Sequence, residues 1–269
     1  MGIFNLFKKP DLPKPNSEST ITNPNLRYLE SVLRQWLNGK VRKEQLLAEK
    51  YYDGEPEILG REKKMIGSDG RLVTIENVPN NKLVDNQYRK LVDQKTNYTL
   101  GKPLSISTAD DEYLNLLNTI FNKQFHRKLR VLTKHAVNCG IAWAYPYYNE
   151  VGEFKIDIFA GHEICPVWKD KAHTELVCAM RYYSEDIFDN KGSIVTVYNV
   201  DLFTEDGIYH YMYQGGNLIA KPAAYTSYLT VNNQPYSWNR FPLIPYKYND
   251  EEIPLIRNVK SLQDSLNQV

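Results

Sequence analysis

Apolar residues recur at helical spacing through the first half of the chain. A first helix is predicted from the stripe Leu26, Leu29, Val32, Leu33, Trp36 and Leu37, ended by Asn38 and Gly39. Further helices are predicted around Leu46, Leu47 and Tyr51, from a capping box of Thr108 with Asp111 through Leu114, Leu117 and Phe121, and from Phe125 through Leu129, Leu132 and Ala136 to Cys139. Between them, "YYDGEPEIL" is typical of a loop and "IGSDGR" of a turn.

The stretch "NKLVDNQYRKLVDQKTNYTLGKPLSI" predicts another helix, which Gly101, Lys102 and Pro103 close. Its apolar stripe is Val84, Tyr88, Leu91, Val92 and Tyr98. We expect this stripe to anchor the helix beneath a sheet. Ion pairs of Arg89 with Asp85 and Asp93, four residues away on either side, are expected to stabilise the helix by about 0.2–0.5 kcal/mol each.

From residue 141 onward the pattern changes to short β-branched and aromatic runs separated by turn residues. The runs are "IAWAYPYY", "FKIDIFA", "EICPVW", "LVCAMRYY", "IVTVYNVDLF", "GIYHYMY" and "YLTV". They predict an antiparallel meander with one face packed on the helices. The fold class is therefore α+β, a helical N-terminal half followed by an antiparallel β-meander.

Three segments are expected along the chain. Residues 1–25, rich in proline and small polar residues, predict a flexible N-terminal arm. Residues 26–250 predict a mixed α+β domain, with helices over about 26–140 and strands over about 141–250. Residues 251–269 predict the beginning of a helix, with Ile256, Val259, Leu262, Leu266 and Val269 at helical spacing. We expect this helix to continue in a longer protein, although a short helix at a natural C-terminus fits the same pattern.

Composition narrows the possible functions. The 33 basic and 32 acidic residues leave a net charge of +1, which argues against binding nucleic acid over a broad basic surface. Lys82, Lys90, Lys95 and Lys102 are the less compensated charges of their helix; a solvated face is the simpler interpretation and a nucleic-acid contact the alternative. Twenty tyrosines suit interfaces and half-exposed strands. No apolar run has the length of a membrane span, so no membrane partner is expected.

The spacing of the cysteines and the lack of complete catalytic motifs argue against an enzyme. Cys139, Cys165 and Cys178 are odd in number and widely spaced, so they predict buried free thiols. "TLGKPL" lacks the upstream glycine and the hydroxyl residue of a phosphate-binding loop. His162 and Glu163 would point to opposite faces of a strand, so no metal site is predicted. We expect no catalytic residue and no cofactor.

Two alternatives from other functional classes stay open at this point. Tyr209, Tyr211 and Tyr213 share one face of a predicted strand and could stack bases of single-stranded nucleic acid; a core or oligomer surface is the simpler interpretation. Asp110, Asp111 and Glu112 could hold magnesium in a nuclease, although acidic residues in a first helical turn more simply complement the helix dipole.

Four ordered stretches together resemble the portal proteins of tailed double-stranded DNA phages, of the type common in siphophages of Gram-positive bacteria. They are "YYDGEPEIL", "PNNKLVDNQYRKLVDQKTNYTLGKPLSI", "CGIAWAYPYYNEVGEFKIDIFAGHEICPVW" and "FPLIPYKYNDEEIPLIRNVKSLQDSLNQV". The second stretch is the most specific, and its structural signature is Val84, Tyr88, Leu91, Val92, Asp93, Tyr98, Gly101 and Pro103.

The resemblance implies a structural subunit of a ring, typically dodecameric, at one capsid vertex. Its implied partners are copies of itself, double-stranded DNA in the channel, terminase, the major capsid and scaffolding proteins, and head-completion or adaptor proteins. The implied location is the virion, or the bacterial host cytoplasm during assembly, with a prophage origin also open. Family members are considerably longer than this chain, so residues 26–250 are expected to resemble the wing domain and residues 251–269 the start of a stem helix.

Overall fold

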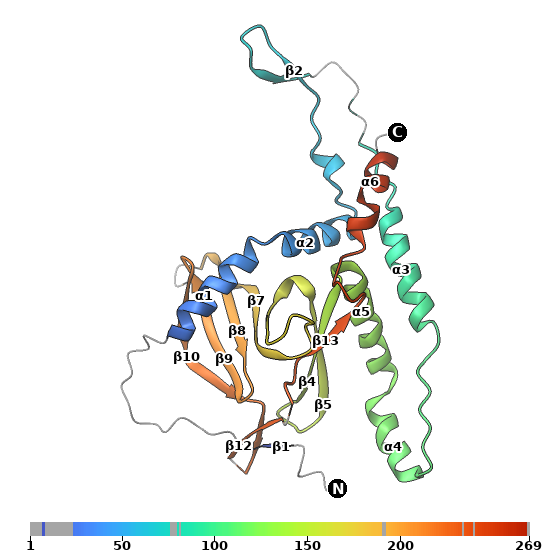
Figure 1. The fold of residues 1–269 in the computed structure, drawn as a ribbon, viewed down its shortest axis with the longest axis vertical. Coiled ribbons are helices and arrows are strands. Elements are labelled where there is room, and N and C mark those ends of the chain that lie inside the picture. Colours follow the sequence, from blue (N-terminus) through green and yellow to red (C-terminus); the bar gives the residue numbers. More distant parts are fainter. Residues whose placement is uncertain are drawn as a thin grey trace.

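Most helices precede residue 140 and most strands follow it, which confirms the α+β class (Figure 1). The computed structural model describes residues 7–8, 24–75, 80, 82–189, 192–232, 234–238 and 240–267; most of the predicted arm, residues 1–25, lies outside this range.

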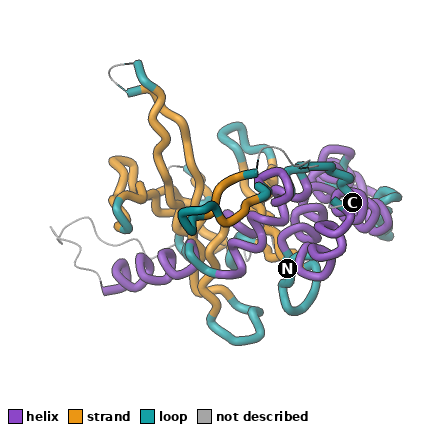
Figure 2. Tube along the Cα trace, turned by 90° about the horizontal axis from the view of Figure 1, so that it is seen from above, coloured by secondary structure: helices purple, strands orange, loops and turns teal. Residues whose placement is uncertain are grey.

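The helices are α1 (Pro24–Leu37), α2 (Lys40–Tyr52), α3 (Gln87–Leu100), α4 (Asp111–Ile120), α5 (Lys123–Cys139) and α6 (Ile256–Leu266), with short 3-10 turns η2 (Glu57–Gly60) and η3 (Gly161–Glu163). Seen from above, most helices gather on one side of the molecule and most strands on the other (Figure 2).

The strands form two main antiparallel sheets, and the predicted antiparallel meander is confirmed in the larger of them. One sheet has the order β10-β9-β8-β7-β6 and the other the order β13-β4-β5. Their strands are β4 (Ile141–Tyr148), β5 (Phe154–Ala160), β6 (Ile164–Trp168), β7 (Leu176–Phe188), β8 (Ile194–Phe203), β9 (Gly207–Gln214), β10 (Asn217–Ser227) and β13 (Ile244–Lys247). Smaller pairings join β1 (Phe7–Lys8), β12 (Gln234–Trp238) and β11 (Leu229–Val231), and β2 (Lys64–Ile66) with β3 (Leu72–Thr74).

Alternation along β4 places a different core on each face of its sheet. Trp143 is fully buried and packs with Phe159 and Phe203 in a core between the two sheets. Ala142 and Ala144 point the other way and pack with Leu132 and Ala136 of α5. Small alanines on that face let the helix lie close to the sheet.

The outer face of the five-stranded sheet is covered by α1. Leu33 of α1 is fully buried against Met180, Val200 and Leu202. The stacking order is therefore α5, the three-stranded sheet, the five-stranded sheet and α1. The prediction of one sheet face on the helices is confirmed for α1, whereas the opposite face packs on a second sheet.

Among the strands after residue 140, three were absent from the sequence prediction: β10, β12 and β13; the short β1, β2 and β3 were not predicted either. In β10 the register with β9 shifts between Ala220 and Tyr225, and Pro222 lies in this irregular segment. A proline and several alanines give a weak strand pattern, and proline is tolerated here because β10 is an edge strand. The predicted turn "IGSDGR" joins β2 and β3 into a hairpin that extends away from the body of the molecule (Figure 1).

The buried face of α6 differs from the predicted apolar stripe. Ile256 is buried, but Leu262 and Leu266 are 66% and 50% exposed, whereas the polar Gln263 and Asn267 are buried. Val269 lies outside the described residues. No helix in the described part of the chain has both the length and the apolar character that crossing a bilayer requires.

Candidate functional site

The start of α3, the most specific part of the sequence signature, is tied to three other helices. Asn86 caps α3, because its Oδ1 accepts a hydrogen bond from the Arg89 N–H at 2.9 Å. The Asn86 amide also donates to the carbonyl oxygens of Tyr51 and Tyr52 at 2.9 and 3.0 Å. One side chain therefore caps α3 and satisfies carbonyls at the end of α2.

Tyr88 is the centre of this helical junction. Its side chain is fully buried, its backbone N–H donates to Gln263 Oε1 of α6 at 2.8 Å, and its hydroxyl donates to Asn138 Oδ1 of α5 at 2.6 Å. Burial raises the pKa of the Tyr88 phenol well above its ordinary value. The phenol thus stays a neutral hydrogen-bond donor to α5, while the backbone N–H of the same residue joins α3 to α6.

The remaining signature residues divide into two groups. Val92 is fully buried, and Asp93 accepts a hydrogen bond from the Tyr52 hydroxyl at 2.9 Å. The predictions for Tyr98 and Leu91 were wrong, since these side chains are 95% and 37% exposed. Val84 precedes the first residue of α3, so it does not belong to the helical stripe.

The buried stripe of α3 consists of Tyr88, Val92, Thr96 and Leu100. This face packs on α2, α5 and α6, so the prediction that α3 lies beneath a sheet was wrong. Gly101 caps the helix in a right-handed conformation, φ −67°, and not in the left-handed one typical of glycine. Pro103 then disfavours helical backbone at the preceding residue.

Three of the four lysines expected as candidate nucleic-acid contacts have partners within the chain. Lys82 donates to the carbonyl of Leu59 at 2.7 Å, and Lys95 lies over the ring of Tyr248. Lys90, not Arg89, pairs with Asp85, at 3.6 Å. Arg89 pairs with Asp93 at 3.8 Å, as predicted.

Lys102 differs from the other three lysines. It is exposed directly after α3, where the described residues give its side chain no hydrogen-bond or ion-pair partner. A DNA contact at these lysines stays a prediction, and the geometry favours Lys102 among them.

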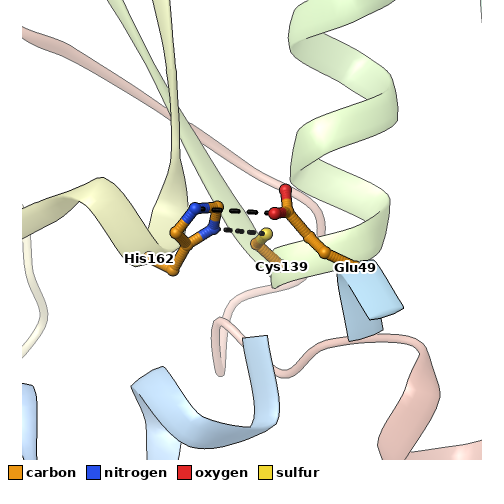
Figure 3. A group of neighbouring side chains, drawn as sticks. All are labelled: Glu49, Cys139 and His162. Atoms are coloured by element: carbon orange, nitrogen blue, oxygen red, sulfur yellow. Dashed lines mark hydrogen bonds and ion pairs between the residues drawn. The ribbon is translucent and has the colours of Figure 1, made fainter. Parts of the chain in front are cut away.

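A second cluster joins residues that lie far apart in the sequence: Glu49 of α2, Cys139 at the end of α5 and His162 of η3 (Figure 3). His162 lies between the other two, with Nδ1 4.0 Å from Cys139 Sγ and Nε2 3.5 Å from Glu49 Oε2. His162 lies in a 3-10 turn and not in a strand as predicted. Glu163 does point elsewhere, toward Arg181 at 3.2 Å.

Burial sets the chemistry of this cluster. It raises the pKa of the Cys139 thiol and lowers the pKa of the His162 imidazole. At Glu49 burial acts to raise the carboxyl pKa, but His135, His162 and Lys134 outweigh it and the pKa lies below its usual value. A fully buried, protonated thiol cannot reach a substrate as a nucleophile, so the Cys–His–Glu row does not support hydrolase chemistry.

The structure shows where the residues of the two alternative site predictions lie. Tyr209, Tyr211 and Tyr213 pack against the core beneath α1, so this face is not an open stacking platform. Asp110 is the N-cap of α4 and accepts from the Tyr113 N–H at 3.0 Å; the predicted capping box at Thr108 was therefore wrong. Asp111 and Glu112 lie in the first helical turn, where they complement the helix dipole. All three cysteines are free and buried, as predicted.

Comparisons with known proteins agree with the sequence signature. The family model described as phage portal protein, SPP1 Gp6-like, matches residues 39–269. The portal protein of Bacillus phage SPP1 is 28% identical over 225 residues, which cover 82% of this chain and 44% of that protein. The portal protein of Clostridium phage phiCD119 is 26% identical over 239 residues, covering 85% of this chain and 51% of that protein. The chain thus spans about half the length of these curated relatives.

Proposed function

We propose a function from the premise that this chain belongs to the SPP1 Gp6-like family of phage portal proteins. In this proposal it is a non-catalytic structural subunit of a ring at the capsid vertex. Double-stranded DNA passes through the ring during packaging and ejection. The observation that carries the proposal is the family match over residues 39–269, which includes the helical junction and both sheets.

The partners follow from that role. Copies of the same chain form the ring, the major capsid and scaffolding proteins surround it, and terminase and head-completion proteins dock on it. The near-neutral net charge of +1 supports a passage role, because strong phosphate binding would hold back moving DNA. Assembly in the host cytoplasm and residence in the virion belong to the same proposal.

The two predicted regions receive distinct roles. Residues 26–250 act as the wing, and residues 251–269 begin the stem. The exposed Leu262 and Leu266 of α6 support this assignment, because an apolar surface on a helix is suited to contact with a neighbouring subunit. We assign a DNA contact to Lys102, the one of the four candidate lysines whose side chain has no partner among the described residues.

Electron microscopy of the full-length gene product tests the ring. Rings with an axial hole are expected, and a strictly monomeric full-length protein at micromolar concentration would contradict the proposal. The double substitution Leu262→Asp, Leu266→Asp should weaken ring assembly while leaving the melting temperature unchanged. The matched pair Val73→Asp and Met65→Asp, on the exposed β2–β3 hairpin, serves as the control for a change of charge alone.

DNA packaging is tested in infected or induced cells. Heads lacking the protein should contain no nuclease-protected DNA, and complementation with the wild-type gene should restore packaging. Complementation with a Lys102→Glu variant should form normal rings but reduce the yield of filled heads. Normal filling with Lys102→Glu would remove the DNA contact from Lys102 without affecting the ring.

A further inference from the structure

The cluster of Glu49, Cys139 and His162 has the composition of a metal site. One atom from each residue, an oxygen, a sulfur and a nitrogen, lies within 4.8 Å of the other two. In the residues that the structure describes, this is the one group of three or more potential ligands at such range. The three side chains come from α2, the end of α5 and η3 and converge on one point (Figure 3).

We propose that this cluster binds a zinc-class divalent ion, with Cys139, His162 and Glu49 as protein ligands. Thiolate, imidazole and carboxylate together suit zinc, whereas magnesium and calcium prefer oxygen ligands alone. Zinc bonds of about 2.0–2.3 Å place one sulfur, one nitrogen and one oxygen ligand about 3.3–3.6 Å apart. The separations, all within 4.8 Å, therefore need to contract by about 1.5 Å at most.

One orphaned polar atom beside the cluster supports the proposal independently. Gln45 Oε1 is buried and has no hydrogen-bond partner among the described residues. Gln45 is one helical turn from Glu49 on α2, and its amide nitrogen donates to the Cys139 carbonyl, so it lies beside the cluster. Buried polar atoms without partners often mark the place of an ordered water or ion.

His135 is suited to position Glu49. Its Nδ1 lies 3.7 Å from Glu49 Oε1, whereas Glu49 Oε2 faces His162. A carboxylate held on one oxygen can offer the other to an ion, which is the usual arrangement around metal ligands. We therefore treat His135 as a positioning residue and not as a ligand.

The backbone around the cluster is fixed before any ion binds. The Gln45 amide donates to the Cys139 carbonyl at 3.0 Å, and Arg42 Nε donates to the His162 carbonyl at 3.0 Å. Gly161 has no room for a side chain, since a Cβ there would lie 2.5 Å from the Ile141 carbonyl oxygen. The ligand-bearing backbone is thus held in place by groups other than the ligands.

Ion binding here would join the helical layer to the sheets. Cys139 lies two residues before β4, His162 lies two residues before β6, and Glu49 lies in α2. On binding, the Cys139 thiol loses its proton to solvent and the sulfur bonds the ion. The side chains of His162 and Glu49 are 16% and 28% exposed, which leaves an entry path from solvent.

Metal binding by the purified full chain tests the proposal, and nothing in the test depends on ring formation. Bound metal is first removed with a chelator, zinc is then added, and the excess is removed by dialysis. About one zinc ion per chain should remain bound. With cobalt(II) in place of zinc, a thiolate-to-metal charge-transfer band should appear. The double variant Cys165→Ala, Cys178→Ala keeps Cys139 as its one cysteine and should retain the band.

The variants of the cluster give the opposite result. Cys139→Ser should abolish the charge-transfer band, His162→Gln should abolish stoichiometric zinc retention, and His135→Ala should weaken zinc affinity by about 10- to 100-fold. If Cys139→Ser fails to fold, the double variant alone decides which cysteine binds. No zinc retention by the wild-type chain, or a band that disappears in the double variant, would overturn the proposal and leave a hydrogen-bonded Cys–His–Glu row.

Discussion

The backbone N–H of Tyr88 donates a 2.8 Å hydrogen bond to Gln263 Oε1, across 175 residues of sequence. Gln263 also donates through Nε2 to the Asp85 carbonyl at 2.7 Å and to Asn267 Oδ1 at 3.1 Å. A free N–H group in the first turn of α3 is thus satisfied by a side chain of α6. Helices α3 and α6, which lie far apart in the sequence, therefore depend on each other for hydrogen bonding.

Replacement of Gln263 by leucine should destabilise the protein. The change leaves the buried Tyr88 N–H without its partner, which costs about 1–3 kcal/mol. The free energy of unfolding, measured with urea, should fall by at least that amount. Leu262→Gln is the matched control, because this neighbouring side chain is 66% exposed and its substitution should change stability by less than about 0.5 kcal/mol. Equal effects at the two positions would show that the junction does not carry stability.

Val92→Asp should abolish soluble expression. Val92 is fully buried between α3 and its neighbouring helices, and a charge placed there has no partner. An unpaired buried charge costs several kcal/mol, comparable with the whole stability of a domain of about 5–15 kcal/mol. Tyr98→Asp on the same helix is the control, because Tyr98 is 95% exposed and should tolerate the charge. Normal yield and melting temperature for Val92→Asp would show that the buried face of α3 was wrongly assigned.

The sequence predicted that α3 and α6 are helices, but it did not predict which face of each helix is buried. Apolar spacing gave α3, yet Tyr98 is exposed and Thr96 is buried, since Thr96 satisfies its hydroxyl on the Val92 carbonyl at 2.9 Å. In α6 the polar Gln263 is buried together with Ile256, and the C-cap Asn267 is buried too, because backbone groups at the start of α3 need the amides of Gln263 and Asn267. The spacing of apolar residues carries no information about which backbone groups of another helix need a hydrogen-bond partner.

The same limit applies to the candidate metal cluster. Short-range motif spacing predicted no metal site at His162, because His162 and Glu163 were expected on opposite faces of a strand. In the structure Glu163 points toward Arg181. The close partners, Cys139 and Glu49, come from helices that only the fold brings together. The chain has no local signal that would pair these three positions before the packing of α2, α5 and η3 is known.

Gly140→Ala should be much more destabilising than Gly152→Ala. Both glycines have a left-handed backbone, φ +84° and +78°, so both substitutions carry a conformational cost of about 1–2 kcal/mol. A Cβ at Gly140 would in addition collide with the backbone of Glu252 and Ile253, whereas Gly152 has open space around it. The loss in free energy of unfolding is measured for both variants by heat or urea, and the difference between the two losses gives the cost of the collision. Similar losses would mean that the α5–β4 connection can shift away from residues 252–253.

Tyr145→Phe should make the protein less sensitive to alkaline pH. Burial, and then the charges of Asp157 and neighbouring groups, raise the pKa of the Tyr145 phenol above its ordinary value of 10.0. Below that value both the folded and the unfolded chain hold the proton, so the phenol does not affect stability. As pH rises past it, the unfolded chain loses the proton while the folded chain retains it, and the free energy of unfolding falls.

The size of this effect follows from the same relation between proton binding and stability. Each such phenol lowers stability by about 1.4 kcal/mol per pH unit in that window, and removing one should reduce the slope by about that amount. The phenylalanine ring keeps the contact with Phe203, whose ring centroid lies 5.2 Å away, so stability near neutral pH should change little. Urea unfolding at a series of alkaline pH values compares the two slopes. Burial also raises the phenol pKa values of Tyr88 and Tyr228, so these residues contribute to the fall in stability of the wild-type protein. The slope of unfolding free energy against pH should therefore be smaller in the variant but not zero. A variant slope equal to that of the wild type would mean that Tyr145 ionises in the folded protein as readily as in the unfolded chain.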